Sequence, residues 1–375
     1  MGVGDAIARL AASHVHVLVV EVPHHWRLRT EVERHVLARN WVLATSPADA
    51  DVMAVCGEPG KQLSEALAMV WHQLPGPRVR LDVRTDDDIS SRLDQAHAAL
   101  LDTGLHRQDA RNRPAAADLL GGQDHDSMDH DSMDHDGHGS MEMSPGGIPL
   151  AEGGEDRDGL EMDVLHLPLG PILAHWPAGL VLRCALQGDV IVEAKAEVLD
   201  QPGGHQPTKH QDAEPALVAA RRCDNIATLL ALAGWDDAAA QARIIRDEVL
   251  TLPPTAGGSS SVEGLAKLHR KVRRSRLLRW SLRGVGSFGS DQIEHQGLPA
   301  EAAGDTYDRL LRMFERAHRD LSGDQPGHPD PVLLSPSRLP TLVTGLDLAT
   351  ARLVIASLDL HELTSEHANH EMAHG

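Results

Sequence analysis

Histidine, methionine and aspartate alternate in a short repeat near the middle of the chain, and these side chains can bind transition metals. The five-residue unit Asp-His-Asp-Ser-Met fills residues 124–128, recurs at 129–133 and continues in a looser form up to Met143. Imidazole and thioether groups together suit copper, and imidazoles alone suit nickel or zinc. The candidate ligands are His125, Met128, His130, Met133, His135, His138, Met141 and Met143.

A second group of histidines lies near residue 375. His367, His370 and His374 have the i, i+3, i+7 spacing that places side chains on one face of a helix, so they are further candidate ligands for copper, nickel or zinc. Because a segment without apolar periodicity loses conformational entropy when it wraps an ion, we expect modest affinity and loose stoichiometry. The alternative, a solvated acidic linker that binds metals incidentally, stays open.

The three cysteines, Cys56, Cys184 and Cys223, are isolated from one another and form no Cys-x-x-Cys pair. Their odd number fits a reducing compartment without a disulfide framework. Cys184 and Cys223 fall in apolar segments and are expected to be small core residues. His24 and His25 could approach Cys56, but two neighbouring loops do not fix a complete ligand set, so surface histidines beside a buried thiol are the favoured interpretation.

Charge and hydropathy exclude some functions. The formal net charge is -20, whereas phosphate binding needs a net basic surface, so no nucleic-acid partner is predicted. No run of about 18 apolar residues occurs, so no transmembrane segment is predicted. The first ten residues lack the basic and apolar regions of a secretory signal, which favours a cytoplasmic protein. No Gly-x-Gly-x-x-Gly turn suggests a nucleotide, and neither catalytic residues nor cofactors are predicted for the folded domains.

The first part of the chain alternates β-rich runs with helical segments, the pattern of an α/β domain. Strands are expected at 15–20, 51–55 and 78–83, and helices at 28–39, 61–74 and 86–102. Such alternation implies a mainly parallel, flavodoxin-like sheet. We assign this domain to residues 1–107 and predict a disordered linker at 108–159, where apolar periodicity is absent.

The second part is expected to form an α-rich α+β domain at 160–360, followed by a His-rich tail at 361–375. The runs 180–186 and 190–194 flank Gln187-Gly-Asp189 as a β-hairpin would. Helices are expected at 214–233, 236–250, 262–283 and 300–321, and a β-type run at 352–358.

The third of these helices carries a basic run over residues 270–283. Helical spacing places four apolar residues on a buried stripe, namely Leu268, Val272, Leu278 and Leu282. The arginines are then free to pair with acidic residues or to face a partner on the membrane side. A solvated face laced with salt bridges is the favoured interpretation.

Two blocks of the sequence combine apolar segments with short turns that contain proline. Residues 50–57 and 66–79, an apolar strand, a helix and a Leu-Pro-Gly-Pro turn, resemble the small, iron–sulfur-bearing subunit of respiratory complex I and of membrane-bound NiFe hydrogenases. Residues 170–192, which begin with Gly-Pro, resemble the start of the large subunit, the 49-kDa-type, NiFe-hydrogenase-like chain. Later segments at 220–246 and 273–286 resemble that subunit too, so the chain is interpreted as a fusion of both.

The resemblance does not extend to the cofactor ligands. A four-iron cluster needs four thiolates, and the small-subunit-like half contains only Cys56. The family's nickel site needs two Cys-x-x-Cys pairs, which are absent. The family's quinone-pocket histidine positions fall on Leu173 and Pro177, with His175 out of register, and Tyr307 is the only tyrosine. The resemblance therefore implies an inherited architecture without cluster, nickel or quinone chemistry.

These observations suggest a cofactor-less structural or coupling subunit of a complex I-like or hydrogenase-like assembly that translocates protons or other cations. The resemblance implies antiporter-like membrane subunits as partners and a location peripheral to the inner face of the cell membrane. One alternative is a copper-, nickel- or zinc-binding protein that uses the linker and tail. Another is a subunit of an active NADH/quinone-type oxidoreductase whose cofactors lie on partner chains. Whether the chain catalyses a reaction by itself stays undecided.

Overall fold

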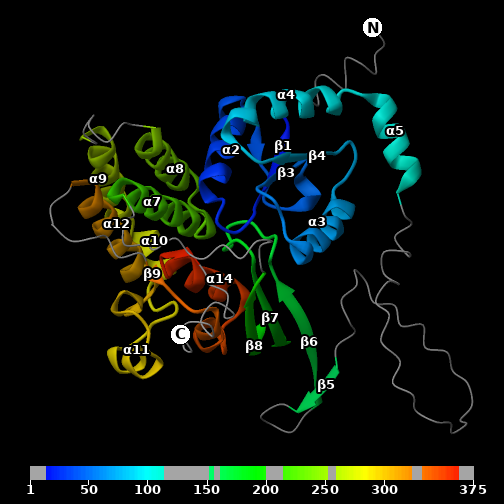
Figure 1. Cartoon of the computed structure of the whole chain (residues 1–375). Coiled ribbons are helices and arrows are strands. Elements are labelled where there is room, and N and C mark those ends of the chain that lie inside the picture. Colours follow the sequence, from blue (N-terminus) through cyan, green and yellow to red (C-terminus); the bar gives the residue numbers. More distant parts are fainter. Residues whose placement is uncertain are drawn as a thin grey trace, which may run out of the picture.

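The computed structural model describes residues 14–113, 152–155, 161–199, 214–251, 259–322 and 332–362. Figure 1 shows a parallel sheet flanked by helices, an antiparallel sheet below it and a group of helices beside both. We call residues 14–113 the N-terminal lobe and the described residues between 152 and 362 the C-terminal lobe. Within the described ranges, no helix is long and apolar enough to cross a membrane.

The N-terminal lobe is built on a parallel sheet, which confirms the predicted α/β class. Its strands, in the order β2-β1-β3-β4, are β2 (Val42–Leu43), β1 (His16–Glu21), β3 (Val52–Cys56) and β4 (Val79–Val83). β3 is buried along its whole length, as expected for a central strand covered on both faces.

The helices of this lobe cover opposite faces of the sheet. α2 (Trp26–Ala38) and α4 (Ile89–Leu100) contribute to the apolar core on one face, and α3 (Lys61–Gln73) contributes to the core on the other. The helix that follows β1 and the helix that follows β3 therefore diverge. Such divergence creates a switch point at the carboxyl ends of β1 and β3, the place where open α/β sheets bind ligands.

The C-terminal lobe begins with an antiparallel sheet. Its strands follow one another in sequence order: β5 (Glu152–Glu155), β6 (Glu161–Leu169), β7 (Leu180–Gln187) and β8 (Val190–Val198). The predicted hairpin between β7 and β8 is confirmed. Leu180, Leu182, Cys184 and Leu186 lie on one face of β7 and pack in one core with α13 (Leu339–Val343) and α14 (Leu348–Ser357).

The helices of this lobe share a second core rich in alanine and leucine. The members are α7 (Pro215–Leu232), α8 (Asp236–Thr251), α9 (Ser259–Arg274), α10 (Arg276–Leu282) and α12 (Thr306–Ser322). The α7–α8 contact uses Ala227, Ala238, Ala239 and Ala242. Their small side chains let the two helices approach closely. The short α11 (Ser290–Gln296) and the parallel pair β9 (Val332–Leu333) and β10 (Leu360–Glu362) complete the lobe.

Several segments differ from the sequence-based expectations. The helix expected at 262–283 is broken at Ser275, whose extended backbone ends α9 and whose hydroxyl accepts a hydrogen bond from Leu278 N at the start of α10. The β-type run expected at 352–358 is helix α14. The Asp347 carboxylate caps that helix by accepting from Thr350 N, so a cap and tertiary packing override local β propensity.

Ordered elements also occupy both ends of the segment expected to be a linker. α5 (Thr103–Asn112) begins with Asp102, which accepts hydrogen bonds from Gly104 N and Leu105 N. β5 lies at the other end of the segment and pairs with β6.

The two lobes share part of their apolar interior. Val181 of β7 and Leu199 belong to the same buried cluster as Leu18 and Val20 of β1. Residues at one end of the antiparallel sheet therefore pack into the core of the N-terminal lobe, and the two lobes share this buried cluster.

Candidate functional site

The loop that follows β1 closes the carboxyl end of the parallel sheet. Val22 N donates to Cys56 O over 3.0 Å, and His25 Nδ1 lies 3.0 Å from Pro23 O. Gly57, which follows β3, has a φ of +111°, and a Cβ there would lie 2.7 Å from the imidazole of His25. The imidazole thus fills the space above Gly57 at the switch point.

A second loop, between β6 and β7, reaches the same edge from the C-terminal lobe. Gly179 has a φ of +72°, and a Cβ there would lie 2.6 Å from Pro23 Cγ of the other lobe. Within the loop, Trp176 Nε1 donates to Leu180 O over 2.9 Å. His175 has a left-handed backbone with φ 58°, a conformation that costs energy in a residue other than glycine and is enriched at functional sites.

These two loops enclose a cavity of about 550 Å³ together with α2, α7 and α8. One part of its wall is apolar and includes Leu43, Ile172, Leu173 and Trp176. The other part is charged and includes Arg29, Glu33, Arg221, Asp224, Arg243 and Arg246. A mixed wall of this kind, at a junction between lobes, is the usual setting of a small-molecule site.

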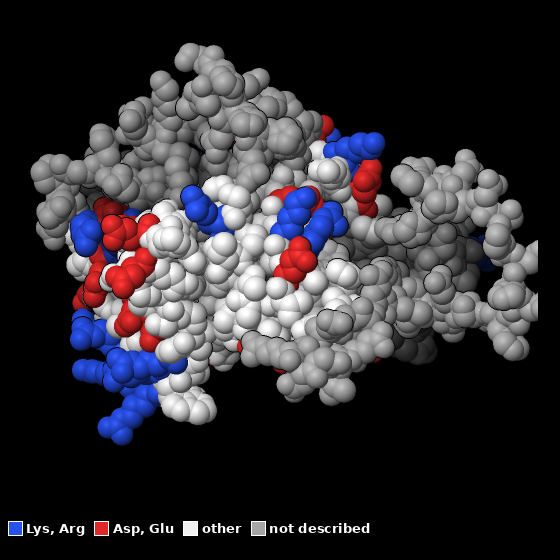
Figure 2. Space-filling view, turned by 90° about the horizontal axis from the view of Figure 1, so that it is seen from below, with Lys and Arg blue, Asp and Glu red and all other residues white. Residues whose placement is uncertain are grey.

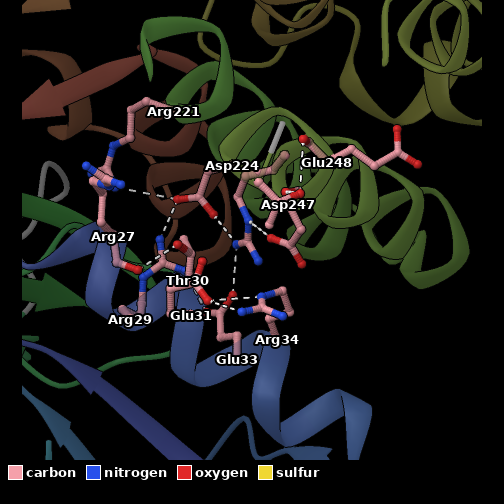
Figure 3. Close-up of polar contacts among 12 residues, drawn as sticks. Arg27, Arg29, Thr30, Glu31, Glu33, Arg34, Arg221, Asp224, Asp247 and Glu248 are labelled. Atoms are coloured by element: carbon pink, nitrogen blue, oxygen red, sulfur yellow. Dashed lines mark hydrogen bonds and ion pairs between the residues drawn. The ribbon is translucent and has the colours of Figure 1, made fainter. Parts of the chain in front are cut away.

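Residues of the charged wall form a buried ion network that joins the lobes. Figure 3 shows Arg29 and Glu33 on α2, with Asp224 on α7 and Asp247 on α8 across from them. The Arg29 guanidinium donates to Glu21, Glu33 and Asp224. Arg246 Nη1 donates to Glu33 Oε2 over 2.8 Å and to Asp224 Oδ1 over 2.7 Å, and its Nε donates to Asp247. Glu33 and Asp224 are therefore each shared by Arg29 and Arg246.

The network fixes the protonation states of its carboxyl groups. Burial alone would raise the pKa of Asp224, but Arg29 and Arg246 outweigh burial and hold that pKa below its ordinary value. The pKa of Glu33 is lowered for the same reasons. Burial raises the pKa of Asp247, and Arg246 does not fully offset this. Asp224 and Glu33 are thus held as carboxylates in the folded protein.

Some arginine donors on the cavity wall are left without protein partners. Arg221 Nε, Arg243 Nε and Arg246 Nη2 are buried and make no hydrogen bond within the described part of the chain. Arg243 forms no ion pair with any described carboxylate. His175 also lines the cavity, and burial, followed by the charge of Arg243, lowers the pKa of its imidazole. A neutral imidazole beside an unpaired arginine can accommodate an anion, since unpaired buried donors are costly until a ligand satisfies them.

A second buried cluster holds Asp359 and Leu360 of the C-terminal lobe against α7. Arg222 Nε donates to Asp359 over 3.0 Å, and Asn225 Nδ2 donates to Asp359 over 3.0 Å and to Leu360 O over 3.1 Å. Asn225 and Leu360 also line the cavity, so this cluster sets the position of its far wall.

The metal ligands predicted from the sequence lie outside the described residues. This holds for His125, Met128, His130, Met133, His135, His138, Met141 and Met143, and for His367, His370 and His374. In the described ranges, no group of three or more His, Cys, Asp and Glu is placed to hold a metal ion. The three cysteines are buried and free, and burial raises the pKa of Cys184 to about 11 and that of Cys223 to about 12.

No protein-family model matches the chain, and no curated protein matches it. Among solved structures, it is similar to a chain of the membrane-bound sulfane sulfur reductase, an archaeal respiratory membrane complex. The identity is 13%, the TM-score is 0.37, and the match covers 52% of this chain and 96% of the other.

Sequence patterns did not reveal the ion network. Arg29 and Glu33 have i, i+4 spacing, which ordinarily indicates an exposed helical pair, and Asp224 sits in a polar Arg-Arg-Cys-Asp-Asn stretch. The available signal was the interruption of the apolar stripe of α7 by Arg222 and Asp224 in a helix whose neighbours are buried. Charged residues in such a position are paired.

Proposed function

We propose that the chain is a structural or coupling subunit of a complex I-like or hydrogenase-like membrane assembly, and that it contains no cluster or nickel centre of its own. Its two lobes correspond to a fused small and large hydrophilic subunit. Multi-span, antiporter-like membrane proteins are its partners at the inner face of the membrane. The chain transmits or supports conformational change instead of carrying electrons.

The observation that carries this proposal is the buried network of Arg29, Glu33, Asp224 and Arg246. Arg29 pairs with Asp224, which lies 195 positions away in the chain, and Arg246 pairs with Glu33, which lies 213 positions away. Each lobe therefore supplies counter-charges for the other. A junction of this type fixes relative orientation, because ion pairs lose their favourable geometry when one partner moves by even an ångström. The resemblance of both halves to respiratory subunits supports a role at the membrane.

Purification of the tagged full chain from mildly solubilised membranes of its native host tests this proposal. We expect multi-span subunits to co-purify in fixed stoichiometry and to stay associated through size-exclusion chromatography. We also expect no stoichiometric iron or nickel on this chain when it is separated from the complex. Recovery of the chain alone, or with an intrinsic iron–sulfur spectrum, would contradict the proposal.

A second candidate function is recognition of a small anion in the cavity between the lobes. The unpaired Arg243, the buried free donors of Arg221 and Arg246 and the adjacent His175 favour it. Inorganic phosphate, sulfate and a short-chain carboxylate are suitable probes in calorimetric titrations. We expect Arg243→Gln to weaken binding about tenfold, because it removes one charged hydrogen bond. Arg107→Gln, on the exposed side of α5, is the matched control and should bind as the wild type does.

Proton uptake distinguishes this site from nonspecific anion binding. Because an anion beside His175 favours the imidazolium, titrations in buffers of different ionisation enthalpy should show protons taken up on binding. If the wild type and Arg243→Gln bind these anions with equal affinity, the proposal of an anion site is wrong.

A further inference from the structure

The corner between α9 and α10 carries a dense, one-sided cluster of basic residues. Between positions 267 and 283 the chain has eight Lys and Arg and no Asp or Glu. They are Lys267, Arg270, Lys271, Arg273, Arg274, Arg276, Arg279 and Arg283, and all are exposed. This cluster stands out in a protein with a net charge of -20. We call these residues, with Leu277 and Trp280, the basic corner.

Two large apolar side chains project from the same corner. Leu277 is 73% exposed and Trp280 is 79% exposed, the largest exposed fractions among the big apolar residues of the described structure. They lie three positions apart on one face of α10, while Leu278 and Leu282 on the opposite face are buried. α10 is therefore anchored by one apolar face and presents a second one to the outside.

The break at Ser275 produces this arrangement. Because Ser275 ends α9 and caps α10, the chain changes direction there. The basic residues therefore lie on both helices, and Leu277 and Trp280 lie among the basic residues of α10 in the sequence. Figure 2 shows basic side chains projecting together from the side of the molecule where Figure 1 places α9, α10 and α12.

The basic side chains are not balanced by carboxylates, contrary to the expected salt-bridged face. Lys267 lies 3.7 Å from Glu263. The other seven form no ion pair with any residue that the structure describes. The Lys271 ammonium lies over the Trp235 ring and the Arg279 guanidinium over the Tyr307 ring, so both charged groups are positioned by aromatic contacts. The buried stripe predicted for Leu268, Val272, Leu278 and Leu282 is confirmed.

We propose that the basic corner binds the anionic headgroups of a lipid bilayer, with Trp280 and Leu277 inserted at the level of the headgroups. Unpaired Lys and Arg are attracted to anionic lipid surfaces, and tryptophan and leucine gain by burial at the interface. A nucleic-acid duplex would engage the same charges, but its bases are stacked inside and offer no apolar layer for Leu277 and Trp280. Charge complementarity and apolar exposure together therefore select a lipid surface. This inference does not depend on the membrane complex proposed above.

Vesicle binding by the full-length protein tests the inference. Vesicles of phosphatidylcholine alone are compared with vesicles that contain phosphatidylglycerol, by co-sedimentation at low and high salt. We expect binding only to the anionic vesicles, with affinity that falls as salt screens the charges. Subtracting the fluorescence of Trp280→Phe from that of the wild type should isolate a blue-shifted emission of Trp280 on binding.

Two variants separate the electrostatic part from the apolar part. Arg273→Glu with Arg276→Glu should weaken binding by at least about 25-fold, at about fivefold for each basic residue removed. Arg107→Glu with Arg111→Glu makes the same change in net charge on exposed residues of α5 and should bind almost as the wild type does. Trp280→Ser should weaken binding about tenfold, and Trp280→Phe should retain most of it.

Three results would overturn the inference. One is equal binding to neutral and anionic vesicles. Another is equal loss of binding in the α5 control and in the basic-corner variant, which would indicate an effect of net charge alone. The third is tighter binding to a DNA duplex that is unaffected by Trp280→Ser, which would identify a phosphate-backbone site instead. If the vesicles bind but no membrane subunit co-purifies from the host, the lipid site stands and the membrane-complex proposal fails.

Discussion

Glu33 and Arg246 lie 213 positions apart in the chain, yet Arg246 Nη1 donates to Glu33 Oε2 over 2.8 Å inside the junction of the two lobes. The Arg246 side chain is fully buried, so its charge depends on Glu33, Asp224 and Asp247 for compensation. The relationship makes the folding of each lobe depend on the other.

Replacing Glu33 should destabilise the protein strongly. Glu33→Ala leaves Arg29 and Arg246 short of one carboxylate in a buried site, a loss of about 3–5 kcal/mol in the free energy of unfolding. Glu31→Ala, which removes the partner of Arg34 on the same helix, should cost under about 1 kcal/mol because that pair is more exposed. Chemical denaturation measures both. Similar losses for the two variants would mean that the junction does not stabilise the fold.

The network should also make the protein acid-sensitive. The folded-state pKa values of Asp224 and Glu33 lie below the ordinary values of 3.8 and 4.5, so their stabilising contribution is present above those values and is lost as pH falls below about 4.5. Asp247 has the opposite effect on stability. Because burial raises its pKa in the folded protein, its contribution to the free energy of unfolding is largest at low pH and is lost as pH rises.

Denaturation midpoints of the wild type and of Asp224→Asn, compared from neutral pH to pH 4 and below, test this sign. At neutral pH the Asp224→Asn variant should be less stable than the wild type. On acidification its free energy of unfolding should fall by less than that of the wild type. If Asp224→Asn does not fold, Glu33→Gln serves the same comparison. A wild type whose stability increases on acidification would show that Asp247 outweighs the two lowered carboxyls.

Close packing at the lobe junction can be tested by a pair of glycine substitutions. Gly179 and Gly188 have similar positive φ values, +72° and +62°, but a Cβ on Gly179 would lie 2.6 Å from Pro23 Cγ, whereas nothing lies within 4 Å of a Cβ on Gly188. Gly188→Ala should cost about 1 kcal/mol from backbone strain. Gly179→Ala should cost about 2–3 kcal/mol more, because the lobes must move apart. Equal thermal shifts for the two variants would argue against direct contact between Gly179 and Pro23.

Metal binding by the Asp/His/Met repeat remains a prediction that the structure does not address. Calorimetric titration of the full chain with copper, nickel and zinc should show modest affinity, and deletion of residues 123–143 should remove most of the copper signal. A variant with His367, His370 and His374 changed to Ala should lose a smaller part of the metal-binding signal than the deletion does. Unchanged titration curves after the deletion would exclude the repeat as a binding segment.

The sequence predicted most helices and strands because their apolar periodicity was clear. β1, β3 and β4 and helices α2, α3, α7 and α8 lie within two residues or so of the expected positions, since each has a buried stripe of Val, Leu, Ile or Ala. The prediction for 352–358 was wrong because Val354 and Ile355 favour strands locally, and the Asp347 cap that decides the matter lies outside the run.

The cavity could not be predicted, because its wall is assembled from α2, the β6–β7 loop and α7–α8, which are remote in sequence. His175 was noted as out of register with a known family, yet the structure places it on the cavity wall. The pairing of Arg246 with Glu33 depends on how the lobes dock, and no local pattern encodes that geometry.

The joining of both lobes in one polypeptide has a thermodynamic consequence for their ionic junction. Two separate chains would have to overcome a large association entropy before such charges could meet, whereas a tethered partner is held at millimolar effective concentration. A junction with only a small net attraction can then remain fully formed at any cellular abundance. Severing the peptide connection should therefore turn a dilution-independent assembly into one that dissociates as the protein is diluted.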